Sequence, residues 1–266
     1  MKEQPIETIE YRGFNINIYH DDDPSMNPVD DWDMFGKMAC WHRNYTLGHE
    51  QPNCEPDEWF KQLAIDADPT VEDRIDYWEN GIGWRRLSIK YPDLSDNRAF
   101  NECEARCKSI IEKAIEKHYT LLSLYLYDHS GITISTSPFS CPWDSGQIGY
   151  VYISNEQLKK EYSKKHMSKK LKQRAIDLMQ SEVNTYDQYL TGEIYGFMIE
   201  PTDKNKSIEC EDSCWGFYGY DHEKSGLLEH AKPSIDYAIK EYKKSVIAER
   251  DRKRQMNQFM RTCWAA

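Results

Sequence analysis

Alternating apolar and polar positions predict strands near both ends of the chain. Residues 7–19 (TIEYRGFNINIYH) alternate and are rich in Ile, Tyr and Phe, a pattern that predicts one strand. A second strand is predicted over 34–45, and we expect it to pair antiparallel with the first across a loop at 20–33. Near the other end, 193–200 and 214–220 predict a hairpin closed by a polar loop.

The middle of the chain predicts helices followed by a second hairpin. Residues 56–80 have the pattern of short helices interrupted at Pro69, and 96–118 is the clearest helix, because its apolar positions recur at spacings of three and four. The residues on that shared face are Phe100, Cys103, Cys107, Ile110, Ile111, Ala114 and His118. A buried strand follows, and Gly131 turns the chain so that 119–136 forms a hairpin.

Serine side chains predict where two later helices begin. After a strand over 147–154, Ser154 and Gln157 resemble a capping box that opens a short helix. Ser168 is placed to cap a longer helix. The inward positions of that helix are Leu171, Ala175, Leu178 and Glu182.

The last helix is predicted over 226–261. Its inward positions are Leu228, Ala231, Ile235, Ala238, Tyr242 and Val246. Beyond them the apolar stripe is lost and the helix becomes basic, so we expect this end to project into solvent or to meet a partner.

Strands joined by hairpins and interleaved with helices predict the α+β class: an antiparallel sheet with flanking helices and a long C-terminal helix. The sequence has no internal repeat and no Pro/Gly/Ser-rich linker, so a single co-folded domain over 1–266 is expected, with a helical insertion at 84–118 as one option.

Charge is distributed unevenly along the 266 residues. The net charge is −11, and residues 1–80 hold 19 acidic and 6 basic side chains, against 26 and 28 in residues 81–266. Such a field repels phosphates and attracts basic protein surfaces or divalent cations, although plain solubility is the more common role. No apolar run approaches the roughly 20 residues of a membrane span, so we expect a cytoplasmic protein.

An aspartate cluster lies in the predicted loop at 20–33. Its members are Asp21, Asp22, Asp23, Asp30, Asp31 and Asp33. Carboxylates suit calcium or magnesium, but the EF-hand pattern fails, since Met26 and Trp32 stand where Gly and Glu are required. We interpret the cluster as a solvated loop and as the candidate surface for docking a basic partner.

The eight cysteines are too few for a disulfide scaffold. Cys103 and Cys107 are four positions apart, as are Cys210 and Cys214, a spacing that zinc sites also use. Free cysteines behave as small hydrophobes, so core thiols are the favoured interpretation and no cofactor is expected; zinc at Cys210 and Cys214 is the minor alternative.

A nucleophile is the other chemical hypothesis. Cys141 could act with Asp144 and a histidine such as His42, although His49, His118 and His129 are also conceivable partners. Asp144-Ser145-Gly146 matches the aspartic protease triplet, but those enzymes need two copies and the chain has one. No Walker A loop, dinucleotide fingerprint or His-Glu-x-x-His motif is present. The basic segment 159–174 has little aromatic interleaving, and the overall charge is negative, so direct nucleic-acid binding is not expected.

Four blocks carry a resemblance: FGKMACWHRNYTLGHE at 35–50, CPWDSGQIGYVYIS at 141–154, TYDQYLTGEIYGFMIE at 185–200 and DSCWGFYG at 212–219. Together they resemble a family of largely uncharacterised proteins encoded by bacteriophages, plasmids and other mobile elements. The resemblance implies no catalytic residues. It implies a setting of host takeover or anti-defence in the bacterial cytoplasm. The motifs themselves place glycines beside aromatic rings, where small residues let rings pack against backbone, so we expect Trp143 and Trp215 to be structural anchors.

Two functions are therefore expected from the sequence. The first is an accessory protein that binds and inhibits a host protein with a basic nucleic-acid-binding groove, such as a CRISPR effector or a restriction enzyme, through phosphate-mimicking carboxylates. The alternative is a cysteine- or metal-dependent hydrolase that acts on nucleic acid or a signalling nucleotide through Cys141, Asp144 and His42.

Overall fold

The computed structural model describes residues 4–24, 26–92 and 97–263, and the chain divides into two compact units. The terminal unit comprises the residues up to Asn27 and those from Gln188 onward, and the central unit comprises Pro28–Asp187. Both contain an antiparallel sheet with helices, so the predicted α+β class is confirmed. The single co-folded domain stays a prediction.

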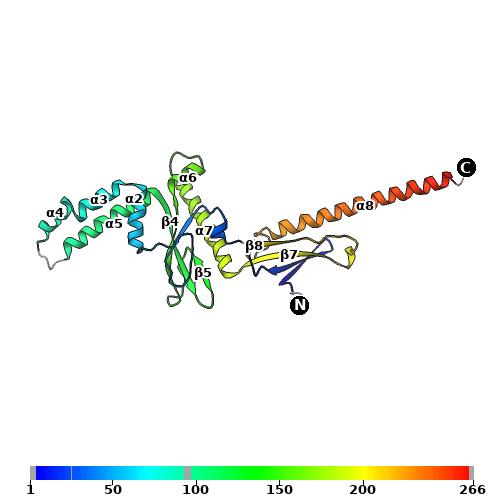
Figure 1. Cartoon of the computed structure of the whole chain (residues 1–266), viewed down its shortest axis with the longest axis horizontal. Helices are drawn as coiled ribbons and strands as arrows, with labels where there is room; N and C mark the ends of the chain where they lie inside the picture. Colours follow the sequence, from blue (N-terminus) through cyan, green and yellow to red (C-terminus); the bar gives the residue numbers. More distant parts are fainter. Residues whose placement is uncertain (1–3, 25, 93–96, 264–266) are drawn as a thin grey trace. The chain divides into compact units, whose positions relative to one another are not determined.

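The terminal unit is built on a four-stranded sheet in the order β1-β2-β7-β8 (Figure 1). Its strands are β1 (Glu7–Tyr11), β2 (Phe14–His20), β7 (Ile194–Pro201) and β8 (Ser213–Tyr218). All neighbours pair antiparallel, and β7 with β8 is the hairpin that the sequence predicts.

A long helix, α8 (Leu227–Cys263), covers one face of this sheet. Alternate residues of the strands face it and form the core with its first turns. These core residues include Phe14, Ile16, Ile18, Phe197, Ile199, Leu227, Ala231 and Ile235. Farther along, Tyr242, Ile247 and Met256 are exposed, and α8 extends beyond the strands of its unit (Figure 1). The predicted helix is confirmed, but Tyr242 does not face inward.

The predicted strand over 7–19 is two strands. Arg12 and Gly13 form the turn between them, with φ angles of 51° and 79°. Hairpin turns with both central residues at positive φ usually carry Asn-Gly or Asp-Gly. Because arginine rarely adopts this conformation, the turn gives a weak sequence signal, and the apolar alternation runs through it.

The central unit contains the second sheet, in the order β3-β6-β4-β5. Its strands are β3 (Lys37–Cys40), β6 (Ser145–Ser154), β4 (Tyr119–Asp128) and β5 (Ile132–Ser135), and β4 with β5 is the predicted hairpin. The predicted pairing of 34–45 with 7–19 is wrong, since β3 pairs with β6 and the two segments belong to different units. The segment 20–33 is also not all loop, because it contains the short helix α1 (Pro28–Asp31).

Helix α7 (Lys169–Thr191) packs on one face of the second sheet. Gly36 lies between α7 and β6, where a β-carbon would stand 3.0 Å from atoms of both Met179 and Val151. Ser168 caps the helix as predicted, since its Oγ accepts the N–H of Leu171 at 3.1 Å. The buried stripe is Leu171, Ala175, Met179, Val183 and Tyr186, so Met179 takes the place predicted for Leu178.

Four helices form a second core in the central unit. They are α2 (Pro56–Ala67), α3 (Thr70–Glu79), α4 (Ile82–Lys90) and α5 (Arg98–His118). The break at Pro69 and the long helix are confirmed, and the residues of the insertion predicted at 84–118 share one core with α2 and α3. On α5, Cys103, Cys107, Ile110 and Ala114 are buried as predicted, whereas Phe100 is exposed.

Helix α2 also contacts the sheet. Phe60 meets the ring of Tyr150 at a centroid distance of 4.7 Å, and Trp59 meets that of Tyr152 at 5.4 Å. The helices α2–α5 are thereby joined to the sheet face opposite α7. The short helix α6 (Asn155–Glu161) follows β6, and its cap Ser154 accepts the N–H of Glu156 at 3.2 Å.

Candidate functional site

The six aspartates of the predicted docking surface are divided between the two units. Asp21, Asp22 and Asp23 belong to the terminal unit, where the N–H of Asp21 donates to the carbonyl of Ile194 at 2.8 Å. Asp30, Asp31 and Asp33 belong to the central unit. Five of the six are exposed and Asp21 is half-buried. The cluster is therefore contiguous in sequence, but it is not part of one structural unit.

The hypothetical nucleophile lies in the loop before β6. The thiol of Cys141 contacts Oδ2 of Asp144 at 3.8 Å, and Nδ1 of His129 lies 3.3 Å from the same oxygen. His42 makes other contacts: its ring stacks on Tyr45 at 4.9 Å, and its Nδ1 accepts the N–H of Tyr45 at 3.2 Å. The structure thus joins Cys141 to Asp144, with His129 as their histidine.

This arrangement does not suit nucleophilic catalysis. A catalytic thiol needs a base beside it to take its proton, with a third group behind the base. Here the carboxylate of Asp144 lies between the thiol and the imidazole. The neighbouring Trp143 is 90% exposed, so its predicted role as a structural anchor is wrong.

The paired cysteines are packed as thiols. Cys103 donates to the carbonyl of Trp78 at 3.2 Å, and Cys210 to that of Ser234 at 3.9 Å. Burial raises the pKa of the Cys107 thiol to about 11 and also raises that of Cys210. Cys214, the other half of the alternative zinc pair, contacts the carbonyl of Trp215. Within the described ranges, no three His, Cys, Asp or Glu side chains gather as a metal site.

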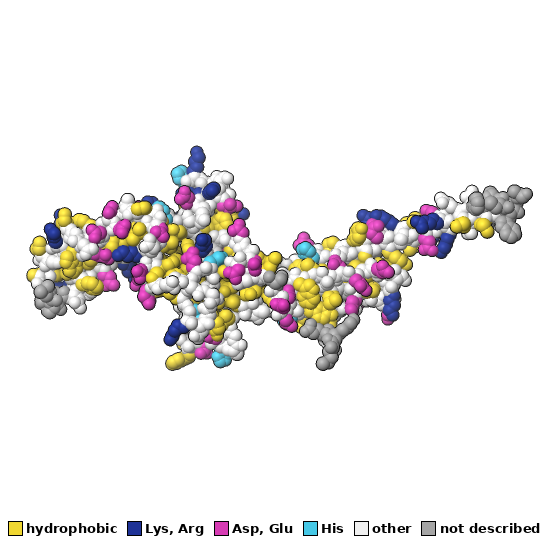
Figure 2. Space-filling model, in the orientation of Figure 1, with side chains coloured by type: hydrophobic (Ala, Val, Ile, Leu, Met, Phe, Trp, Pro, Cys, Tyr) yellow, Lys and Arg dark blue, Asp and Glu magenta, His cyan; other side chains and the backbone are white. Residues whose placement is uncertain are grey.

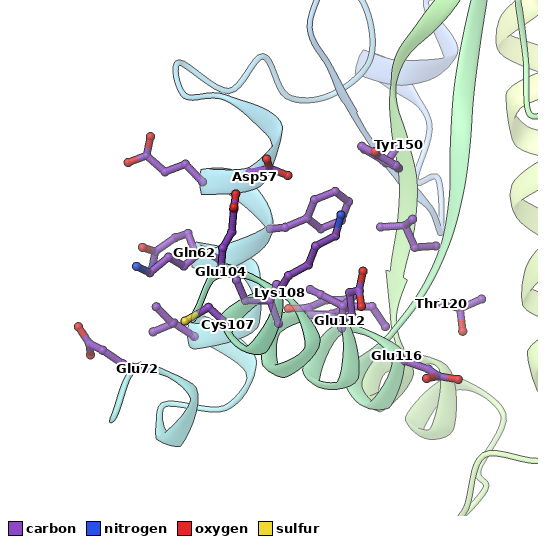
Figure 3. Close-up of a pocket in the computed structure, with 18 of the residues that line it drawn as sticks. Asp57, Gln62, Glu72, Glu104, Cys107, Lys108, Glu112, Glu116, Thr120 and Tyr150 are labelled. Atoms are coloured by element: carbon purple, nitrogen blue, oxygen red, sulfur yellow. The ribbon is translucent and has the colours of Figure 1, made fainter. Parts of the chain in front are cut away.

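A groove of about 1070 Å³ lies in the central unit, where α2 and α5 approach the sheet and α7 (Figure 3). Helix α5 forms one wall. Glu104, Lys108, Glu112 and Glu116 follow one another at intervals of four along it. Cys107, Ile111 and Ile115 form the adjacent row, because positions four apart lie above one another on a helix.

The rim of the groove is predominantly acidic. Its carboxylates are Asp57, Glu58, Glu72, Glu104, Glu112 and Glu116, and its amines are Lys61, Lys108 and Lys172. None of these six carboxylates forms a hydrogen bond or ion pair with the described side chains. In the space-filling view, acidic side chains are spread along α2–α5 with apolar side chains between them (Figure 2).

Helix dipoles account for only half of these acids. Asp57 and Glu58 lie in the first turn of α2 and Glu72 in that of α3, where negative charge is stabilised. Glu112 and Glu116 lie well beyond the first turn of α5, four residues apart, which is an unfavourable spacing for like charges. Lys108, four residues from both Glu104 and Glu112, offsets part of this repulsion, so local helix stability explains the acidic row only in part.

The floor of the groove is apolar and aromatic. Phe60 and Ile65 come from α2, Tyr150 from β6 and Ile176 from α7. Such a floor can bury apolar side chains of a ligand while the rim selects its charge. This site is not evident from the sequence because its residues are scattered between positions 57 and 176. The row of charged residues at 104, 108, 112 and 116 beside the apolar row at 107, 111 and 115 was the available signal.

Comparison with protein families, with curated proteins and with solved structures found no match for this chain. Among the described helices, none is long and apolar enough to cross a membrane.

Proposed function

We propose that this protein is a binding protein whose central unit holds a basic segment of another protein in the groove beside α5. The observation that carries the proposal is the row of carboxylates on α5, unpaired with described side chains, above an apolar floor. Cationic side chains of a partner would supply the missing counter-charges, and its apolar side chains would bury the floor. Electrostatic complementarity of this kind gives specificity and fast association.

A protein partner fits this surface better than a nucleic acid does. The rim holds twice as many carboxylates as amines, so it repels phosphates. The same sign of charge suits the basic surface with which a nucleic-acid-binding protein contacts its phosphates.

The wider role follows from the resemblance to proteins of bacteriophages and mobile elements. In that setting, the partner is a host protein with a basic nucleic-acid-binding groove, such as a CRISPR effector or a restriction enzyme. Occupying that groove inhibits it by displacing the nucleic acid. The hydrolase alternative has weaker support, since Asp144 separates Cys141 from the imidazole of His129.

Capture from bacterial lysate tests this function with matched variants. The groove variant carries Glu104→Gln, Glu112→Gln and Glu116→Gln, and the control carries Asp21→Asn, Asp22→Asn and Asp23→Asn, so each loses three negative charges. We expect the wild type and the control to retain a basic protein at about 0.1 M salt and to release it near 1 M, where screening is strong. The groove variant should fail to retain this basic protein at either salt concentration.

The captured protein is then purified and its affinity measured directly. Equal affinity for the wild type and the groove variant would refute binding in the groove. Equal loss in the groove variant and the control would mean that only total charge matters, and the groove would then have no specific role.

A further inference from the structure

One edge of the central sheet is open next to the groove. β4 pairs with β6 along Tyr119–Tyr127 on one side, but β5 covers only Tyr125–Asp128 on the other. The N–H of Tyr119 is used at the end of α5, where it donates to the carbonyl of Ile115. The open edge is therefore Thr120–Leu124, where no strand of the described chain pairs on the β5 side.

This edge lacks the features that usually protect strands. Edge strands avoid intermolecular pairing by means of charged residues, prolines or short length. β1, at the edge of the other sheet, carries Glu7 and Glu10, and β5 has only four residues. Residues 120–124 (TLLSL) contain neither charge nor proline. Such an edge is suited to accept another strand.

The groove reaches this edge of β4 as well as the face of the sheet that carries Tyr150. Tyr119, Thr120 and Leu121 all line the groove, although successive side chains of a strand point to opposite faces. The lining continues to α5 on one side of the sheet and to Lys172 and Ile176 of α7 on the other. Figure 3 draws Thr120 across the groove from Asp57 and Gln62 of α2. A ligand in the groove thus lies alongside the backbone of β4.

We propose that the groove binds its partner as an extended strand that adds to the open edge of β4. The inference rests on the proposed function and specifies the form of the bound segment. In strand addition, main-chain hydrogen bonds give affinity and alternate side chains give specificity. Here, Lys or Arg side chains of the segment face Glu116 and Glu112, the members of the acidic row nearest the start of β4, and the residues between them face α7. Five paired residues span about 17 Å of strand.

The test uses defined peptides and the full-length protein. The first probe is an eight-residue peptide that alternates lysine and valine, and a peptide with glutamate in place of lysine controls for charge. Two further probes carry N-methyl groups on alternate residues, in opposite phases. In an antiparallel ladder only every second N–H of a strand points to a given neighbour. Fluorescence anisotropy measures the affinity of each peptide.

We expect the lysine–valine peptide to bind and the glutamate peptide not to bind. One N-methyl phase should weaken binding at least tenfold and the other should leave it within threefold. Amide hydrogen exchange within Thr120–Leu124 should slow when the peptide is bound. The groove variant should bind the lysine–valine peptide at least tenfold more weakly than the wild type does. The Asp21/Asp22/Asp23 control should bind it as tightly as the wild type.

The contrary results distinguish failure of strand addition from failure of the groove as the docking site. Equal binding of both N-methyl phases, with the groove variant still impaired, overturns strand addition and leaves the groove as the docking site. If neither N-methylated peptide binds and the bound lysine–valine peptide is helical by circular dichroism, the segment binds as a helix and strand addition is wrong. Absence of binding by the lysine–valine peptide overturns it as well. A dimer in light scattering that the peptide dissociates would make a second copy of the chain the occupant, against the proposal.

Discussion

Gly196 of β7 lies directly beneath the indole of Trp215 on β8. A β-carbon at position 196 would stand 2.1 Å from Cε3 of the ring, closer than any real contact. The ring also approaches Tyr19 of β2, at a centroid distance of 6.3 Å. The glycine therefore allows the indole to lie flat across the sheet, and it explains why tryptophan is accommodated at this half-exposed position.

Replacing Gly196 by alanine should destabilise the terminal unit. The added methyl group forces the indole away from the strand, and overpacking of this kind costs about 1–3 kcal/mol. Urea unfolding followed by far-ultraviolet circular dichroism measures the cost. In a Trp215→Ala background the same substitution should cost less, because the ring that it displaces is gone. An equal cost in both backgrounds would assign the effect to the backbone of β7 instead.

Glu182 of α7 should make stability depend on pH. Its carboxylate accepts the N–H groups of Phe35 at 2.6 Å and Gly36 at 2.8 Å, yet burial is the stronger influence and raises its pKa above the ordinary 4.5. An acid with a raised folded pKa binds protons more tightly in the folded state, so its contribution falls as pH rises from about 4.5 through that raised value.

The measurement compares unfolding free energies of the wild type and Glu182→Gln between pH 4 and pH 8. The difference should shift against the wild type as pH increases and then level off. Asp177→Asn, an exposed substitution on the same helix, controls for the loss of one negative charge. A shift in favour of the wild type over this range would contradict the assigned cause.

Glu112→Gln should weaken binding and leave the stability of the protein nearly unchanged. The change relieves the repulsion from Glu116 and removes the attraction to Lys108, each four positions away and each worth about 0.2–0.5 kcal/mol on a helix surface. The same change removes a counter-charge for the basic partner. Thermal unfolding and the affinity for the lysine–valine peptide check the two effects. A variant that is less stable, or that binds as well as the wild type, would remove the functional explanation of the acidic row.

The aspartates at 21–33 provide a comparison between long-range and contact electrostatics. Two variants, Asp21/Asp22/Asp23 and Asp30/Asp31/Asp33 to asparagine, should each remain folded, because exposed carboxylates contribute little to stability. Association of the partner should slow by less than in the groove variant, for which we expect about tenfold. Stopped-flow measurements compare the association rates of the two aspartate variants with that of the groove variant. A larger loss in either aspartate variant would restore that part of the cluster as the docking surface.

Substitutions at Cys141 and Asp144 should have small effects. The Asp144–His129 pair is exposed, with 40% and 66% of the side chains accessible, and such pairs contribute less than about 1 kcal/mol. We expect Cys141→Ala and Asp144→Asn to unfold like the wild type and to capture the partner normally. Loss of partner inhibition in Cys141→Ala, with binding retained, would instead favour the hydrolase hypothesis.

Local patterns predicted the long helices and the hairpins β4–β5 and β7–β8, but not the hairpin β1–β2 or the short helix α1. The spacing along α5, the break at Pro69 and the turn at Gly131 are decided by neighbours in sequence, and all three are present. The partner of β3 is decided by packing more than 100 residues away. At Gly149 of β6, an added β-carbon would stand 2.1 Å from the carbonyl oxygen of Ala39 on β3. Nothing in residues 34–45 alone distinguishes that partner from the strands nearby.

The candidate sites were also predictable only as far as their residues are close in sequence. Cys141 and Asp144 are close in sequence and were predicted together, whereas the choice of His129 over His42 required knowledge of the turn after β4. The groove needed still more, because Phe60, Ile111, Tyr150 and Ile176 come from four elements. Sequence spacing reveals a single wall of such a site, and the tertiary fold supplies the others.

The terminal unit, with strands from both ends of the chain, has a consequence for synthesis on the ribosome. Asn17 of β2 bonds to Glu200 of β7, 183 positions later. At elongation rates of about 5–20 residues per second, the first hairpin waits roughly 10–40 s for that strand to emerge. Throughout this interval Ile16 and Ile18, fully buried in the finished fold, have no core to enter. The nascent chain thus exposes a ready ligand for ribosome-associated chaperones, and the strands made first are the last to be enclosed.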